Sequence, residues 1–347
     1  TQEFLLRISR PTSASKIQKA VQTMTARHSM LQARFEQQEN DEWAQIVDRE
    51  AKDRLQFRKH WLRSIEDQEG VQKIFSDSQN KLDIKKGTLV IIDFIETESQ
   101  EQYLGLMAHH LVMDLVSWRV LLHDLEDILT AGHPLQPASI SFQQWCRLQK
   151  DYVQEFLDPE QALAESIPAP PLTYWGPPAS WIGNTWGDTV QRSIVISQDA
   201  TQAIFGPAND AFHTRPVEII HTAVLYAFSR IFDNRPTPTV FSEGHGREPW
   251  DPRIDVSRTV GWFTTIAPLF VKAKRDQHVT ELLKLIKDGR RDIPRNGWAY
   301  FASRYLHPEG MNFCQGHSPM EILFNYTGLF QQLERPGALL QLASVPD

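Results

Sequence analysis

The chain has 347 residues, with 36 Lys and Arg against 43 Asp and Glu and a formal net charge of −7. This acidic balance argues against a nucleic-acid binder, because phosphate backbones are bound by clustered cations. With 41% hydrophobic and 23% charged residues, the composition is that of a folded protein, and no apolar run reaches the roughly 20 residues that span a bilayer. We therefore expect a globular, cytoplasmic protein with no membrane or nucleic-acid partner.

The two cysteines, Cys146 and Cys314, lie far apart in the sequence and form no CxxC motif. They predict neither a disulfide framework nor a metal site, and Cys146 is expected to pack in the core from an amphipathic helix. The chain begins at Thr1 rather than Met and ends soon after its last motif. We therefore expect an excerpt of a longer polypeptide.

The first half of the chain alternates strand and helix patterns. Strands are expected at 3–9, 88–96 and 102–109. Helices are expected from Ser13 or Ser15 onward, after Ser117 as N-cap and ending at Gly132, and near 142–156. These elements together predict one α/β lobe.

The second half repeats the mixture of strands and helices after a segment rich in Pro, Trp and Gly. That segment, 158–188, favours an extended crossing rather than a packed element. Beyond it we expect helices at 215–232 and 280–289 and strands at 238–242 and 321–326. Hairpin-like spacings accompany the alternation, so the prediction is an α/β (α+β) fold with mixed sheets. The predicted domains are a lobe at 1–160, a linker at 161–188 and a lobe at 189–347.

The segment His109-His110-Leu-Val-Met-Asp114 follows a predicted strand. Adjacent strand residues point to opposite faces, so a catalytic histidine is favoured over a metal pair. Histidine exchanges protons near neutral pH, and Asp114 is placed to orient the ring or the loop. Taken alone, the pair is equally compatible with a purely structural feature.

The segment Glu243-Gly-His245-Gly-Arg-Glu248 also follows an apolar strand. The glycines allow a close approach of the backbone, and a partly buried Glu243 would be a general acid or base. Taken alone, the segment favours a turn with a solvated cluster of charges over this catalytic role. Two further segments, 258–264 with Trp262 and 324–328 with Asn325 and Tyr326, fit either the wall of a ligand channel or ordinary core packing.

Motifs of several other enzyme classes are absent from the sequence. There is no P-loop, no GxGxxG after a strand, no GxSxG elbow and no HExxH. The sequence therefore does not support a nucleotide-binding, serine-hydrolase or zinc-protease function.

The segments HHLVMDLVSW (109–118), EGHGRE (243–248), RTVGWFT (258–264) and FNYTG (324–328) occur in this order. Together they resemble the motifs of the epimerization domains of nonribosomal peptide synthetases, within the condensation-domain superfamily. Segments at 2–36, 139–145 and 295–300 are also similar to family segments, so the resemblance covers nearly the whole chain. It implies two chloramphenicol-acetyltransferase-like lobes in a V-shaped pseudo-dimer, with a central tunnel.

The chain departs from the family pattern in a few places. Leu115 stands where a Gly often follows the Asp of the His motif, and the segment at 295–300 has fewer glycines than usual. The family also has a strand region before residue 1 and a substantial part after residue 328. The lobe at 189–347 is therefore expected to be incomplete at its C-terminus.

The resemblance implies an isomerase that inverts the Cα of an aminoacyl or peptidyl thioester. Inversion needs proton-transfer groups on opposite faces of Cα, and the resemblance assigns this to His110 and Glu243. It gives supporting roles to His109, Asp114, Ser117 and Arg258, with Arg258 as the ion-pair partner of Asp114. It places Trp118, His245, Trp262, Asn325 and Tyr326 along the tunnel, where Asn325 and Tyr326 would bind the pantetheine arm or the enolate oxygen.

The same resemblance implies that the domain itself binds no cofactor and no metal. The 4'-phosphopantetheine would be supplied by an upstream peptidyl carrier protein domain, beside other synthetase domains. Two alternatives stay open: a condensation domain that joins two carrier-bound substrates, and a catalytically silent carrier-docking domain. Glu243, together with Trp118 directly after Ser117, favours epimerization over condensation, and the intact His110, Asp114 and Glu243 argue against a silent docking domain.

Overall fold

The computed structural model describes residues 1–48, 55–163, 167–176, 185–232, 234–328, 335 and 337–343. Two compact units make up the chain. The first comprises Thr1–Leu148, Pro249–Thr264 and Thr327–Asp347, and the second comprises Gln149–Glu248 and Thr265–Tyr326. Both units combine helices with sheets, so the predicted mixed α/β class is confirmed.

The first unit is built on a five-stranded sheet of order β10-β1-β6-β5-β4. Its strands are β1 (Gln2–Ile8), β4 (Leu55–Leu62), β5 (Val90–Thr97), β6 (Gln102–Ala108) and β10 (Leu340–Ala343). Only β4 and β5 pair in parallel, and the other neighbours are antiparallel. A hairpin of β2 (Ala33–Gln37) and β3 (Trp43–Val47) stands apart from this sheet.

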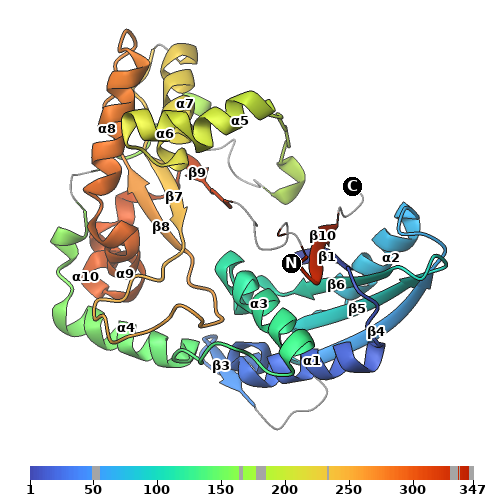
Figure 1. Ribbon diagram of the computed structural model, residues 1–347. Coiled ribbons are helices and arrows are strands. Elements are labelled where there is room, and N and C mark those ends of the chain that lie inside the picture. Colours follow the sequence, from blue (N-terminus) through green and yellow to red (C-terminus); the bar gives the residue numbers. More distant parts are fainter. Residues whose placement is uncertain are drawn as a thin grey trace. The chain divides into compact units, whose positions relative to one another are not determined.

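Helices cover both faces of this sheet (Figure 1). Helices α1 (Ala14–Arg27) and α3 (Leu115–Ala131) share one core with Leu6, Ile8 and their neighbours, whereas α2 (Gln68–Gln79) packs on Leu5 and its neighbours. Successive strand residues point to opposite faces, which is why Leu5 and Leu6 enter different cores. Both leucines are fully buried.

The second unit has a three-stranded sheet of order β8-β7-β9. The strands are β7 (Val240–Gly244), β8 (Thr265–Leu269) and β9 (Ile322–Phe324), with β9 parallel to β7. Helices α7 (Pro216–Ile231) and α8 (Val279–Arg291) pack on the face of Val240, and α9 (Trp298–Leu306) packs on the face of Phe241. The remaining helices are α4 (Phe142–Phe156), α5 (Gln198–Phe205), α6 (Pro207–Phe212) and α10 (Pro308–Phe313). No helix among the described residues is long and apolar enough to cross a membrane.

Most predicted elements lie where the sequence patterns put them, with two differences near the predicted site residues. Helix α3 begins at Leu115 with Asp114 as its N-cap, so the prediction that Ser117 caps it is wrong. Its predicted end is confirmed, because Gly132 adopts φ 85°. Strand β7 extends to Gly244, so Glu243 is a strand residue rather than the first residue of a loop.

The two compact units do not follow the order of the sequence. Residues 249–264 and 327–343 belong to the first unit, although both segments fall inside the lobe predicted at 189–347. Of the predicted linker at 161–188, residues 164–166 and 177–184 lie outside the described residues. The domain boundaries drawn from the sequence remain a prediction. Cys146 is exposed, so its predicted core position is wrong, whereas the neighbouring Trp145 on α4 is buried.

Candidate functional site

The two histidines after β6 have different surroundings. His109 is the N-cap of a short 3-10 helix at His110–Val112, and its Nδ1 accepts a hydrogen bond from the Leu111 N–H at 3.2 Å. Burial lowers the pKa of His109, which favours the neutral ring needed for this bond. His109 therefore stabilises the turn that presents His110.

His110 contacts residues from two distant segments of the first unit. Its Nε2 lies 3.0 Å from Nε2 of Gln2, and the Oε1 of Gln2 accepts a hydrogen bond from the indole N–H of Trp118 at 2.8 Å. The ring of Trp262 lies with its centroid 5.0 Å from that of His110. Nδ1 of His110 is buried and has no hydrogen-bond partner in the part of the chain that the structure describes.

The two tryptophans predicted to line a tunnel differ in exposure. Trp262 is 43% exposed beside His110, whereas Trp118 is 2% exposed and packs edge-on against Phe4 at 5.1 Å. The prediction of a lining role for Trp118 is therefore wrong, because α3 turns this side chain toward the core. Trp118 instead affects the site indirectly, through its hydrogen bond to Gln2.

Asp114 joins the histidine turn to the segment at 258–264. Its Oδ1 accepts from the backbone N–H of Ser117 at 2.7 Å and from the Ser117 hydroxyl at 2.8 Å, and its Oδ2 accepts from the Phe263 N–H at 3.2 Å. Asp114 is 3% exposed. A buried carboxylate with these partners holds backbone groups in place.

Gly261 lets the same segment approach α3 and Phe142 closely. Its N–H donates to the Ser117 hydroxyl at 3.1 Å. A Cβ at this position would lie 2.2 Å from a ring carbon of Phe142, so no larger residue fits without movement. This close approach places Trp262, the next residue, against His110.

Arg258 pairs with a different carboxylate from the predicted one. Its guanidinium binds Asp124 on α3, so the prediction of an Asp114–Arg258 pair is wrong. Asp124 is fully buried and also binds Arg27 at 3.0 Å and His28 at 2.8 Å. Burial alone would raise the pKa of Asp124, but the His28 hydrogen bond and the nearby Arg258 charge outweigh it and lower the pKa.

The second unit carries the predicted carboxylate on its central strand. Glu243 is half-buried near the end of β7 and pairs through its backbone register with Ile266 of β8. After β7 the chain turns at Gly246, with φ 65°. His245 is exposed and lies 3.3 Å from Glu248, whose carboxylate also accepts from Asn296 at 3.0 Å. His245 therefore belongs to a surface charge cluster.

Asn325 and Tyr326 follow strand β9, the parallel neighbour of β7. The register pairs Ser242 of β7 with Phe324, the last residue of β9. Asn325 and Tyr326 are exposed, and partial burial raises the pKa of Tyr326. Glu243 on β7 and Asn325 after β9 thus each follow the Ser242–Phe324 pair by one residue.

Gln2 is the contact residue that the motif analysis did not identify. It pairs with Ala108 across the β1–β6 register, two residues before His110. Along β1, Gln2 shares its face with Phe4, Leu6 and Ile8, which face the main core. A polar residue in this apolar row is the sequence signal that could have indicated it, because a polar group there needs a partner.

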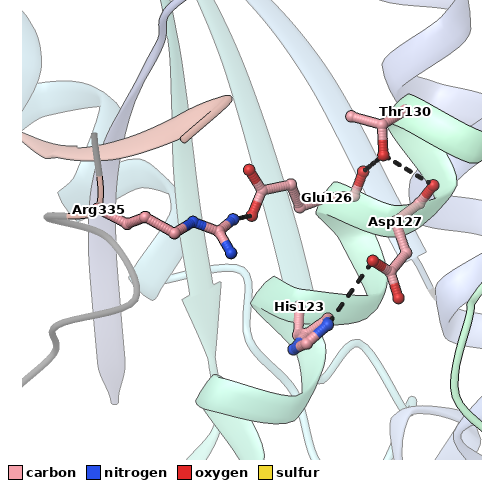
Figure 2. A pocket seen from close by; sticks show the side chains of 5 residues that line it. All are labelled: His123, Glu126, Asp127, Thr130 and Arg335. Atoms are coloured by element: carbon pink, nitrogen blue, oxygen red, sulfur yellow. Dashed lines mark hydrogen bonds and ion pairs between the residues drawn. The ribbon is translucent and has the colours of Figure 1, made fainter. Parts of the chain in front are cut away.

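A pocket beside α3 shares no lining residue with these groups (Figure 2). It has a volume of about 220 Å³ and is lined by His123, Glu126, Asp127, Thr130 and Arg335. Its charged groups bind one another: Arg335 lies 2.7 Å from Glu126, and His123 lies 3.6 Å from Asp127. Glu126 also accepts from the Leu339 N–H at 2.8 Å, so these contacts attach the segment before β10 to α3.

Comparison with known proteins gives a family match over most of the chain. The sequence model of the protein family described as the condensation domain matches residues 1–301 of this chain. The nonribosomal peptide synthetase ungA' of Aspergillus campestris is 44% identical over 345 residues, which are 99% of this chain and 4% of that protein. The nonribosomal peptide synthetase fmqA of Aspergillus fumigatus is 40% identical over 351 residues, 100% of this chain and 9% of that protein. The chain thus spans a small part of the length of these relatives.

Solved structures share the fold. The epimerization domain from the third module of tyrocidine synthetase B matches with a TM-score of 0.76 at 21% identity, covering 99% of this chain and 78% of that one. The first condensation domain of the calcium-dependent antibiotic synthetase, in complex with a substrate analogue, matches with a TM-score of 0.62 at 16% identity, covering 85% and 69%. The predicted fold is therefore confirmed as a mixed α/β fold of the condensation-domain type.

Proposed function

The chain belongs to the condensation-domain family, and on this premise we propose that it is an isomerase of nonribosomal peptide synthesis. It inverts the Cα of an aminoacyl or peptidyl thioester carried on the 4'-phosphopantetheine arm of a peptidyl carrier protein. The domain binds no cofactor of its own, because a thioester makes its Cα–H acidic enough for side chains to remove the proton. Its partners are the upstream carrier domain and the neighbouring synthetase domains.

The observation that carries this proposal is the position of Glu243. A condensation reaction requires one group to manage the proton of the attacking amine, whereas inversion requires a second group on the other face of Cα. Glu243 is half-buried near the end of β7, one residue beyond Ser242, which pairs with Phe324 of β9. A carboxylate in this setting is suited to exchange a proton with carbon, and the amide of Asn325, the residue after Phe324, is proposed to bind a developing enolate oxygen.

His110 supplies the other proton-transfer group in this proposal. Its ring is held between Gln2 and Trp262, on a turn that His109 and Asp114 stabilise. Such preorganisation is what an acid or base needs in order to meet Cα in one orientation. Trp262, Asn325 and Tyr326 are proposed to contact the pantetheine arm or the thioester, and His245 is proposed to lie along the same path.

The test is exchange at Cα. A carrier protein loaded with an L-aminoacyl or peptidyl pantetheine thioester is mixed with the protein in heavy water, and the hydrolysed product is analysed for deuterium and for its D:L ratio. Deuterium uptake with approach to a mixed D/L population supports epimerization.

Two other outcomes contradict the proposal. Amide formation with an acceptor aminoacyl carrier, without exchange at Cα, would assign the protein to condensation, a reaction named for one of the solved structures that share its fold. Binding of the loaded carrier with neither activity would assign it to carrier docking.

A further inference from the structure

We propose that Gln2 is a positioning residue for His110, and that its side-chain amide determines which ring nitrogen of His110 carries the proton. The inference rests on the proposed role of His110 in proton transfer. It concerns a residue on β1, outside the histidine motif and 108 positions away from His110 in the sequence.

The orientation of the Gln2 amide follows from its second partner. The indole nitrogen of Trp118 is a hydrogen-bond donor only, and it lies 2.8 Å from Oε1 of Gln2. Trp118 is 2% exposed, so reversing the amide would place two donors against each other in the core. The NH₂ group of Gln2 must therefore face His110.

The amide orientation then decides the state of the imidazole. Nε2 of His110 lies 3.0 Å from the NH₂ group of Gln2, so it must present a lone pair and accept. A neutral ring in this contact carries its proton on Nδ1, and a doubly protonated ring would lose the hydrogen bond. Because Nδ1 is buried without a partner among the described residues, proton exchange is expected at Nε2, once the substrate has displaced the Gln2 NH₂ group from the single lone pair of that nitrogen. Gln2 thus keeps Nε2 free of a proton until the substrate binds.

The fold holds Gln2 in this position from two sides. The β1–β6 register pairs Gln2 with Ala108, which fixes its backbone next to the histidine turn. Phe4, two residues along the same face of β1, packs edge-on against the Trp118 ring. The three residues therefore form one unit in which neither the amide nor the indole can turn without losing a contact.

The first experiment measures the tautomer of His110 directly. Histidine-selective ¹⁵N NMR of the whole chain, without substrate, distinguishes an Nδ1–H ring from an Nε2–H ring. We expect the Nδ1–H tautomer in the wild type and a shift toward Nε2–H in Gln2→Leu, because nothing then opposes a proton on Nε2. Trp118→Phe, which frees the amide to reverse, should shift the ring in the same direction. Gln79→Leu, an exposed position on α2, is the matched control and should leave the ring unchanged.

The second experiment measures the pH dependence of Cα exchange. Gln2→Glu keeps the shape of the side chain and still accepts from Trp118, but its carboxylate favours a protonated ring. The acidic limb of the rate profile should therefore move to higher pH by about one unit. Gln2→Leu should lower kcat by about ten- to a hundredfold with little change in KM, and Gln79→Leu should match the wild type.

The two readouts separate this inference from the proposed function. A wild-type tautomer in both Gln2→Leu and Trp118→Phe would overturn the role of Gln2, whatever the activity. A tautomer that depends on Gln2 in a protein without Cα exchange would keep the positioning role and remove the epimerization proposal. If Gln2→Leu does not fold, the tautomer in Trp118→Phe and the profile of the isosteric Gln2→Glu decide the question.

Discussion

Around His110 in the first unit, hydrogen bonds join residues that are 108 to 149 positions apart in the sequence. Around Glu243 in the second unit, the register of β7 with β8 and β9 provides the placement. An imidazole has two different nitrogens, so its function depends on partners that distinguish them. The two oxygens of a carboxylate are equivalent, so the position and burial of Glu243 are enough to define its function. We therefore expect mutations around His110 and mutations of Glu243 to have different effects.

The largest expected effect comes from Glu243→Gln. Because backbone register positions this residue, the amide should occupy the same place, with the melting temperature close to that of the wild type. Without this second proton-transfer group, the rate of inversion at Cα, measured from the D:L ratio, should fall by about 10²–10⁴-fold, although His110 is still present. Glu248→Gln, a matched change in the neighbouring charge cluster, should keep the inversion rate within about twofold. An unchanged inversion rate in Glu243→Gln would refute the proposed role of this carboxylate.

Asp124→Asn tests the ion-pair network of the first unit. The change leaves Arg27 and Arg258 without their buried carboxylate, so we expect a loss of about 3 kcal/mol in the free energy of unfolding at neutral pH. The pKa of Asp124 is lowered in the folded state, so its contribution is present above the ordinary carboxyl range and is lost as the pH falls through the lowered value. Asp77→Asn on the exposed side of α2 is the control in urea titrations. Equal stability of the two variants would contradict the prediction.

His221 makes the second unit sensitive to acid. It is fully buried on α7 against Phe324, and burial lowers its pKa from 6.5 to about 3. Below pH 6.5 the unfolded chain binds a proton that the folded ring does not, so stability should fall by about 1.4 kcal/mol per pH unit until about pH 3.

The measurement is the free energy of unfolding at several values of pH for the wild type, His221→Leu and His133→Gln. His221→Leu should lose less stability in acid than the wild type. The exposed His133→Gln should keep the wild-type slope. Identical slopes for all three proteins would show that His221 does not titrate as proposed.

Gly261→Ala should have the smallest of these effects and should act on the first unit. The added Cβ meets the Phe142 ring, so the segment carrying Trp262 must shift, at a cost of about 2 kcal/mol in unfolding free energy. Gly316→Ala, where a Cβ meets nothing within 4 Å, is the control. Thermal unfolding of both variants checks the prediction, and an unchanged stability of Gly261→Ala would show that this close approach is not needed.

Local patterns were sufficient to predict most elements. Ser13 is the N-cap of α1 and Gly132 ends α3, as the capping rules predict. The start of α3 was predicted incorrectly because both Asp114 and Ser117 are good caps. The choice depends on the carboxylate of Asp114 accepting from the Ser117 N–H and from Phe263, which lies 149 positions away.

By itself, the sequence determined the family, the mixed α/β class and the identity of the proposed proton-transfer groups, because motifs and periodicities are local. Only the tertiary structure decided that Arg258 binds Asp124, that Trp118 is buried and that Gln2 contacts His110. These contacts join distant segments, and their partners are chosen by packing and by the requirement that buried polar groups be hydrogen-bonded. No spacing along the chain encodes that requirement.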